Sequence, residues 1–279
     1  MLATVPPIQI GGRRFEWGVR TYLMGIVNVT PDSFSGDGVL DPALAADQAA
    51  RMVAGGADLI DVGAESTRPG HAPLSVDEEW TRLKAPLRAI RAAVDAPITV
   101  DTSKAGVAER AFDAGADALN DVQGLLGDAD LAPLLARRAL PAVVMHNQRD
   151  RTFGGDVIGD IRTGLRESIE AAERAGVDAH RLILDPGFGF GWEPAQNLEM
   201  VRRLAELRDL GRPLLVGVSR KSTLGLVLDK PEHERVWGTA AAVALAVHGG
   251  ADIVRVHDVA EMADIVRIAD AISRPGVRP

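Results

Sequence analysis

The stretch Leu184-Asp185-Pro186-Gly187-Phe188-Gly189-Phe190-Gly191 indicates the fold of this 279-residue chain. It begins as a short apolar run and ends abruptly in an acidic residue and a glycine-rich loop. The same change from apolar to polar recurs at Gly217–Lys221 and at Val254–Asp258. In an α/β barrel the active site is built where the parallel strands end. A row of polar residues at the ends of apolar runs therefore predicts such a barrel with its site at one end.

Outward from this stretch, apolar runs and helical patterns alternate eight times. The runs are continuous, which is typical of strands buried on both faces. They are Tyr22–Val27, Leu59–Val62, Ile98–Val100, Ala118–Leu119, Ala142–Met145, Leu182–Leu184, Leu214–Val216 and Ile253–Val256. The helical patterns include Ala43–Val53, Glu78–Val94, Ile161–Ala175 and Asn197–Leu210, and a glycine that can cap a helix precedes several strands. We predict an α/β fold, a single-domain (β/α)8 TIM barrel over residues 21–279.

Residues 1–20 are expected to form an N-terminal β-hairpin extension, because Ile8–Trp17 alternates apolar and polar residues around Gly11-Gly12. A doubly wound open sheet is the alternative to the barrel. No glycine-rich dinucleotide fingerprint follows the first strand, which disfavours that alternative.

Composition excludes several classes of protein. The net charge of −8 argues against non-specific nucleic-acid binding. The chain has no cysteine, so disulfides, thiolate nucleophiles and cysteine-based zinc sites are excluded. Its longest fully apolar run, Ala240–Val247, is too short to span a bilayer, and Pro6-Pro7 interrupts any signal-peptide core. We expect a cytoplasmic protein that does not bind membranes.

Polar residues close the predicted strands. They are Asn28, Glu65 after Gly63, Asp101, Asn120 with Asp121, His146, Asp185, Ser219, and Arg255 with His257. One such residue alone is most often a cap for the following helix, and we assign Asp121 and Asp258 to that role. A polar residue at the end of every strand is harder to explain by capping, and this pattern favours a binding site.

These residues divide by chemistry. Asp101, Asn120 and Asp185 offer carboxylate and amide groups suited to the flat aminopyrimidinone edge of a heterocycle. Arg255 and His257, with Arg68 from a loop, suit phosphate, and Asn28 can offer an oxygen to Mg²⁺. For Arg255 a structural salt bridge with a nearby aspartate is an equal alternative. The loops 30–38 and 64–73, rich in Pro, Gly and hydroxyl residues, follow the first two strands at the same predicted end.

At this point the chain resembles the dihydropteroate synthase family of folate biosynthesis. The resemblance runs from Met24 to Ile272 and rests on eight short motifs in this order. They are Met24–Ser35, Glu65–Gly70, Val100–Thr102, Asn120-Asp121, Met145-His146, Asp185–Gly191, Ser219–Lys221 and Arg255–Asp258. The family fold is a (β/α)8 barrel, in agreement with the prediction from the apolar runs.

The resemblance implies a transferase. It condenses 6-hydroxymethyl-7,8-dihydropterin pyrophosphate with p-aminobenzoate to give 7,8-dihydropteroate and pyrophosphate. It also implies Mg²⁺ as cofactor at Asn28, small-molecule substrates as partners, and a homodimer. The implied catalytic residues are Asp101, Lys221, Arg255 and His257. The implied pterin-binding residues are Asp101, Asn120, Met145, Asp185, Phe190 and Lys221. The implied pyrophosphate-binding residues are Asn28, Thr67, Arg68, Arg255 and His257. The implied p-aminobenzoate-binding residues are Phe34, Pro69, Ser219 and Lys221.

Two other functions fit part of the pattern. Methyltetrahydrofolate-dependent methyltransferases use similar pterin-binding barrels but hold no pyrophosphate, so the Ser219–Lys221 and Arg255–His257 motifs disfavour them. A catalytically silent pterin-binding or regulatory relative would have lost a site group, and all the charged positions are present.

Overall fold

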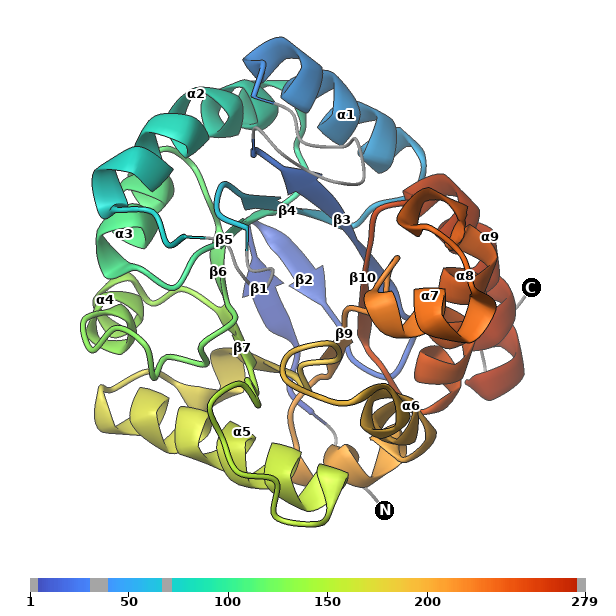
Figure 1. Ribbon diagram of the computed structural model, residues 1–279. Coiled ribbons are helices and arrows are strands. Elements are labelled where there is room, and N and C mark those ends of the chain that lie inside the picture. Colours follow the sequence, from blue (N-terminus) through green and yellow to red (C-terminus); the bar gives the residue numbers. More distant parts are fainter. Residues whose placement is uncertain (1–4, 31–39, 67–71, 275–279) are drawn as a thin grey trace.

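The computed structural model describes residues 5–30, 40–66 and 72–274. In these ranges eight parallel strands form one sheet surrounded by helices, and Figure 1 looks into the ring. The strands of this sheet are β3 (Tyr22–Asn28), β4 (Leu59–Gly63), β5 (Ile98–Asp101), β6 (Ala118–Asp121), β7 (Ala142–Met145), β8 (Leu182–Asp185), β9 (Leu215–Val216) and β10 (Ile253–Val256). Four of these strands, β3, β5, β6 and β8, continue through the polar residue that was predicted to follow them, because the backbone ladder does not depend on the side chain.

The sheet closes on itself. Its order is β8-β7-β6-β5-β4-β3-β10-β9, so β8 and β9 stand at its two ends. A parallel bridge joins Leu184 to Leu214, and the Leu184 N–H donates to the Pro213 carbonyl at 2.9 Å. This bridge connects the two ends and confirms the predicted barrel rather than the open sheet.

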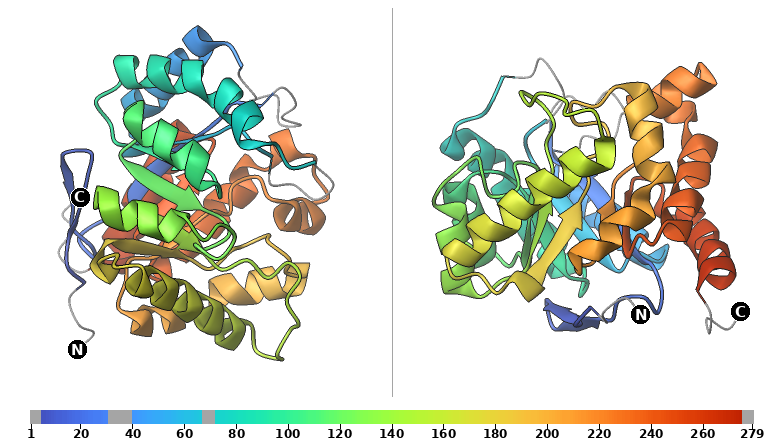
Figure 2. Two further views of the ribbon diagram at one scale, coloured as in Figure 1. Left: turned by 90° about the vertical axis from the view of Figure 1, so that its left-hand side faces the viewer. Right: turned by 90° about the horizontal axis from the view of Figure 1, so that it is seen from below.

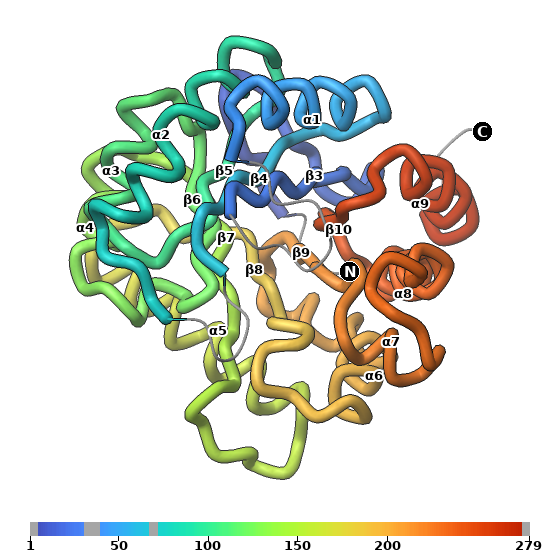
Figure 3. Tube along the Cα trace, turned by 45° about the horizontal axis from the view of Figure 1, so that its top comes forward, coloured from blue at the N-terminus to red at the C-terminus, as the bar shows by residue number. Residues whose placement is uncertain are grey.

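The helices follow the strands in chain order around the barrel, as the Cα trace in Figure 3 shows. They are α1 (Pro42–Ala54), α2 (Val76–Ala93), α3 (Ala105–Asp113), α4 (Leu131–Arg138), α5 (Val157–Arg174), α6 (Pro194–Arg202), α7 (Ser222–Leu228), α8 (Val236–His248) and α9 (Val259–Ser273). Short 3₁₀ segments η1 (Ala179–Arg181), η2 (Leu204–Leu210) and η3 (Glu232–Glu234) connect some of them. No helix of the described part of the chain is long and apolar enough to cross a membrane.

The prediction of one continuous helix over Asn197–Leu210 is wrong. The α-helix ends at Arg202, Arg203 leaves helical geometry at φ −107° and ψ 13°, and the 3₁₀ segment η2 follows. Leu204 and Leu207 are both fully buried. The three-residue repeat of a 3₁₀ turn places them directly above each other, so packing of this pair favours the tighter winding over the α-helix that propensity alone predicts.

Inside the barrel the chemistry changes along the strands. Residues two apart on a strand point to the same side. Near the amino ends the inward residues are apolar, such as Leu59 and Ile183, whereas two positions later they are Asp61 and Asp185. The intervening residues, such as Ile60 and Leu184, pack outward on the helices. Several strands therefore have apolar sequences, while their last inward position carries a polar side chain at the carboxyl end of the barrel.

The amino end of the barrel is closed by the N-terminal hairpin. Strands β1 (Ile8–Ile10) and β2 (Arg13–Phe15) pair antiparallel and lie across that end, as Figure 2 shows. Ile8, Ile10 and Phe15 are buried among the first inward residues of the barrel strands. With one end covered by apolar packing, the open end for a ligand is the carboxyl end.

Candidate active site

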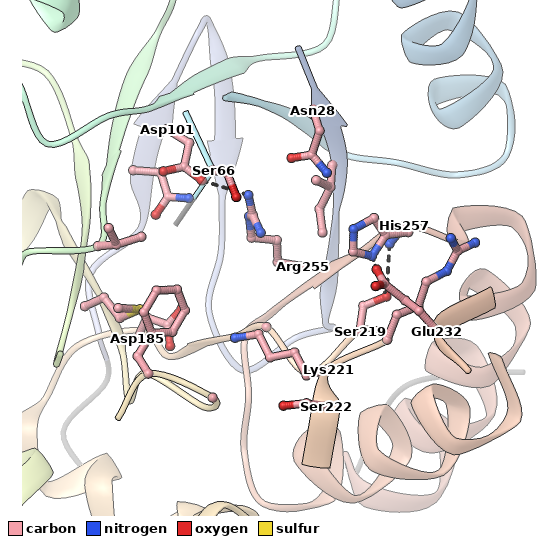
Figure 4. Close-up of a pocket in the computed structure, with 18 of the residues that line it drawn as sticks. Asn28, Ser66, Asp101, Asp185, Ser219, Lys221, Ser222, Glu232, Arg255 and His257 are labelled. Atoms are coloured by element: carbon pink, nitrogen blue, oxygen red, sulfur yellow. Dashed lines mark hydrogen bonds and ion pairs between the residues drawn. The ribbon is translucent and has the colours of Figure 1, made fainter. Parts of the chain in front are cut away.

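A cavity of about 550 Å³ opens at the carboxyl ends of the barrel strands, within the range usual for small-molecule sites. Figure 4 shows side chains from several strands and loops converging on it. Among its lining residues are the predicted site residues Asn28, Asp101, Asn120, Met145, Asp185, Phe190, Ser219, Lys221, Arg255 and His257. Phe34, Thr67, Arg68 and Pro69 lie outside the described residues.

The loop after β8 forms one wall of the cavity and depends on glycine. Gly187 has φ +78°, and a Cβ atom there would lie 1.9 Å from the His146 carbonyl oxygen. Asn197 on α6 holds the loop from behind, because its Oδ1 accepts from the Gly189 N–H at 2.6 Å while its Nδ2 donates to the Trp192 carbonyl at 3.1 Å. The Asp185 carboxylate accepts from the Gly187 N–H at 2.7 Å. The loop is thereby fixed against the strand that carries Asp185.

Lys221 faces Asp185 from the other side of this loop. Its Nζ donates to the Phe188 carbonyl and lies 4.7 Å from the centre of the Phe190 ring. Burial lowers the pKa of Lys221 to about 8, although the negative charge of Asp185 opposes the shift. Burial raises the pKa of Asp185, while Lys221 opposes that shift too. A buried acid and a half-buried base with pKa values moved toward each other are typical of a functional site.

Arg255 lies at the centre of the polar layer, between Asp101 and the side of the cavity formed by Asn28 and His257 (Figure 4). Its Nη2 donates to Asp101 at 2.9 Å, and its Nε donates to the buried Asp61 at 2.6 Å. The two alternatives considered for Arg255 are therefore not exclusive. It makes salt bridges with two aspartates and at the same time lines the cavity.

The carboxylates of Asp61 and Asp101 share the single guanidinium of Arg255, and this sharing affects the pKa of Asp101. Burial, followed by repulsion from Asp61, raises the pKa of Asp101 to about 7, and Arg255 opposes the rise only in part. Asp101 is therefore near its titration midpoint at neutral pH. A positive charge brought next to it by a ligand would favour the ionised form.

Ser219 and His257 form a second pair at the cavity wall. The Ser219 Oγ lies 2.9 Å from His257 Nδ1 and also accepts from the His257 backbone N–H at 3.2 Å. Arg220, between Ser219 and Lys221, takes the left-handed conformation at φ +55°, which is unfavourable for a residue with a side chain. The Thr239 hydroxyl accepts from its N–H at 3.0 Å, and this contact holds the bend that turns both neighbours toward the cavity.

Neither of the two predicted helix caps forms. Asp121 is fully buried and accepts from the backbone N–H groups of Gln123 and Leu125. It therefore holds the turn after β6 and does not cap a helix, because the next helix, α4, begins at Leu131 after Asp130.

The prediction for Asp258 is also wrong. It precedes α9 without a side-chain capping bond and instead accepts from the Arg220 Nε at 3.0 Å. The ion pair with Asp258 holds the strained turn at Arg220. The Asp258 carboxylate therefore pairs with Arg220 instead of capping α9.

His146, read from the sequence as one of the strand-end polar residues, is buried beside the Trp192 ring and does not line the main cavity. Its Nε2 lies 2.8 Å from the Gln148 side-chain oxygen.

Sequence reasoning missed Asp61. It was passed over because it stands inside the run Leu59–Val62 rather than at its end. A lone carboxylate inside a buried strand is nevertheless a usable signal, because it must be paired to be tolerated. The cavity also includes lining residues that no prediction named, among them Ile26, Val122, Arg149 and Glu232.

Comparison with known proteins agrees with this geometry. The family model described as pterin binding enzyme matches residues 24–257. A dihydropteroate synthase from Synechocystis is 45% identical over 277 residues, which cover 96% of each chain. The chain belongs to the dihydropteroate synthase family of pterin-binding enzymes.

Solved structures of this family have the same fold. A dihydropteroate synthase from Clostridium difficile, solved in the presence of pteroic acid, has a TM-score of 0.89 at 45% identity and covers 93% of this chain and 99% of its own. A dihydropteroate synthase from Xanthomonas albilineans with 4-aminobenzoic acid has a TM-score of 0.89 at 40% identity and covers 96% and 98%. The family match extends from β3 to the end of β10, and so includes every strand that contributes to the cavity.

Proposed function

We propose that this chain is a transferase of folate biosynthesis that condenses 6-hydroxymethyl-7,8-dihydropterin pyrophosphate with p-aminobenzoate, forming 7,8-dihydropteroate and pyrophosphate. The observation that carries the proposal is the composition of one cavity. Its lining combines carboxylate and amide groups, from Asp101, Asn120 and Asp185, with Arg255 and His257, and Arg255 lies between Asp101 and the side of His257 (Figure 4). The similar proteins solved with pteroic acid and with 4-aminobenzoic acid support the same substrate classes.

The pterin half of the reaction follows from Asp185 and its neighbours. A buried carboxylate next to Lys221 can accept two N–H donors from an aminopyrimidinone ring. Lys221 can donate to a ring acceptor, and Met145 and Phe190 offer apolar surface to the ring faces. Because most of these groups are buried, a ligand with the wrong donor pattern would leave one of them unpaired, which is costly.

The leaving-group half follows from Arg255. When the bond between the pterin methylene carbon and the pyrophosphate oxygen breaks, negative charge grows on pyrophosphate and positive charge on the pterin. Arg255 and His257 are placed to stabilise the former, and ionised Asp101 the latter. Thr67 and Arg68 are proposed to contribute to the same anion. The amine of p-aminobenzoate then attacks the methylene carbon and loses a proton, so no protein nucleophile is needed.

Mg²⁺ is part of the proposal. Among the described residues no group of three or more His, Asp or Glu side chains could hold a metal by itself. Asn28 nevertheless lines the cavity beside Arg255, and Mg²⁺ often binds through one or two protein oxygens together with substrate phosphates and water. The residues present fit such an ion, with Asn28 as its protein ligand. When bound, the ion would neutralise charge on the departing pyrophosphate.

For p-aminobenzoate we propose Ser219 and Lys221, together with Phe34 and Pro69. Ser219 is held by His257 in a fixed orientation at the cavity wall. In this proposal the second substrate binds where its amine can reach the methylene carbon of the pterin.

We further propose that the enzyme is a cytoplasmic homodimer. Its substrate carries a pyrophosphate, whose charge would keep it from crossing a membrane. Large apolar side chains on α7 and α8 are exposed, including Leu226 at 68%, Trp237 at 73% and Leu245 at 60%. A patch of this kind is typical of a protein–protein interface, and a second copy of the chain is the proposed partner.

The test is single-turnover formation of dihydropteroate by Arg255→Ala and Arg255→Lys at saturating substrates and Mg²⁺. Loss of one such preorganised charge typically reduces the rate by about 10²–10³. Lysine restores charge without the planar fork, so it should recover only part of the rate. Arg174→Ala, on the exposed surface of α5, serves as the control. A folded Arg255→Ala variant with a rate within about twofold of wild type would contradict the assignment, because that loss is far below the expected range.

A further inference from the structure

Asp61 is a carboxylate buried inside the barrel. It lies in the middle of β4, is 0% exposed and does not line the cavity. Ionised side chains are expensive to bury, and an apolar pair of similar volume is often as stable or more stable. Since the neighbouring residues Ile60 and Val62 show that the strand otherwise carries apolar side chains, packing alone does not explain an aspartate here.

The contacts of Asp61 connect the two halves of the site. Its Oδ2 accepts from Arg255 Nε at 2.6 Å and from Asn120 Nδ2 at 2.9 Å, and its Oδ1 accepts from the Thr99 hydroxyl. Arg255 belongs to β10 and Asn120 to β6, on either side of β4 and β5 in the sheet. One carboxylate thus holds a residue assigned to pyrophosphate and a residue assigned to the pterin.

Each contact also fixes an orientation. A guanidinium bound at Nε by Asp61 and at Nη2 by Asp101 is held in one plane, whereas an arginine with a single partner can rotate. An Asn120 amide that donates its Nδ2 to Asp61 must present its Oδ1 on the other side. Asn120 Oδ1 can then accept from a ligand N–H, and only the second hydrogen of its Nδ2 remains to donate.

We propose that Asp61 is a positioning residue, which sets the plane of the Arg255 guanidinium and the direction of the Asn120 amide in one step. The inference rests on the proposed function, because it assigns Arg255 to the leaving group and Asn120 to the pterin. It predicts that Asp61 affects catalysis without touching substrate.

A pH profile distinguishes this role from mere support of the fold. Asp101 is faced by Asp61 and Arg255, and more weakly by Glu79 and Asp121. Removing the negative charge of Asp61 ends its repulsion of the Asp101 carboxylate. Arg255 then pairs with Asp101 as its only remaining carboxylate partner among these two. The midpoint of the activity profile that belongs to Asp101 should therefore move to lower pH.

The main variant is Asp61→Asn, which keeps the shape but replaces one acceptor by a donor. Its one oxygen can still face Arg255 and Asn120, but it is neutral, so the ion pair that holds the plane of the guanidinium is lost and Arg255 is less well oriented. We expect the single-turnover rate at saturating substrates to fall by about tenfold or more, a part of the loss expected for removing the Arg255 charge itself. The KM for the pterin should change less than kcat if Arg255 is the residue that moves.

Asp121→Asn is the matched control. Asp121 is also 0% exposed, sits on β6 of the same sheet, and binds Ser103 and two backbone N–H groups instead of Arg255 or Asn120. It should lose stability but keep kcat. Should Asp61→Asn fail to fold, Thr99→Val carries the test, because it removes the hydroxyl that holds Asp61 Oδ1. It should lower kcat and leave the pH midpoint in place, since Asp61 keeps its charge.

A folded Asp61→Asn with kcat and pH midpoint equal to wild type would overturn the proposal, as would, in its place, a folded Thr99→Val with kcat equal to wild type. An equal loss of kcat in Asp121→Asn would overturn it too. Wild-type protein is run in the same assay. If it forms no dihydropteroate, the proposed function fails, and that failure is separate from the outcome for Asp61.

Discussion

The raised pKa of Asp101 predicts how the stability of the protein depends on pH. Burial and Asp61 raise this pKa from its ordinary value of 3.8 to about 7. In the range between these values the folded state holds a proton on Asp101 that the unfolded chain has released. The free energy of unfolding should therefore fall as pH rises, by about 1.4 kcal/mol per pH unit from this one group.

The full magnitude follows from the same numbers. At 1.36 kcal/mol for each unit of pKa, the rise from 3.8 to about 7 corresponds to a loss of about 4 kcal/mol. This is an upper bound, because 15% of the Asp101 side chain is exposed to solvent, which screens its charge. The stabilising contribution is complete below about pH 4 and is lost as pH passes 7.

The assay is urea unfolding of wild type and Asp101→Asn between about pH 4.5 and 7.5. The variant cannot titrate at this position, so its stability should decline less steeply than that of wild type. A constant difference from the altered bond to Arg255 does not affect the comparison, which uses the slopes. Asp264→Asn, at a side chain that is 86% exposed, is the control and should run parallel to wild type. Parallel curves for wild type and Asp101→Asn would refute the reasoning.

Two more predictions concern the wall formed by the loop after β8. Asp185→Asn keeps the acceptor for the Gly187 N–H but turns a donor toward the pterin, which should cost about 1–3 kcal/mol and weaken pterin binding at least several-fold in calorimetry; unchanged affinity would remove Asp185 from the site. Gly187→Ala should destabilise the protein more than Gly12→Ala, since both have positive φ but only a Cβ at 187 meets backbone; equal losses in thermal unfolding would show that close approach is unimportant.

Much of the site could be predicted because it follows from local rules. Asn28, Asp101, Asn120 and Asp185 directly follow apolar runs and occupy the last or next-to-last positions of the strands. In a parallel barrel those positions all meet at one end. Neither the strand order nor any distance is needed for that conclusion.

Other features depend on which residues meet across the fold. Asp258 does not form the predicted helix cap, because its carboxylate pairs with Arg220, which lies 38 residues away in a strained turn. The continuous helix predicted after Asn197 is divided because Leu204 and Leu207 must both reach the core. Local propensity cannot anticipate a competing partner from another part of the chain.

By itself the sequence determined the barrel, the end of it that carries the site and the chemical types gathered there, because strand periodicity and strand ends are properties of neighbouring residues. Only the tertiary structure decided the charge state and orientation of those groups. Asp61 and Arg255 are 194 residues apart, and their contact exists only once the barrel has closed. Burial and pairing in that closed interior set the pKa of Asp101 and of Lys221, because the electrostatic cost of a charge depends on its three-dimensional surroundings.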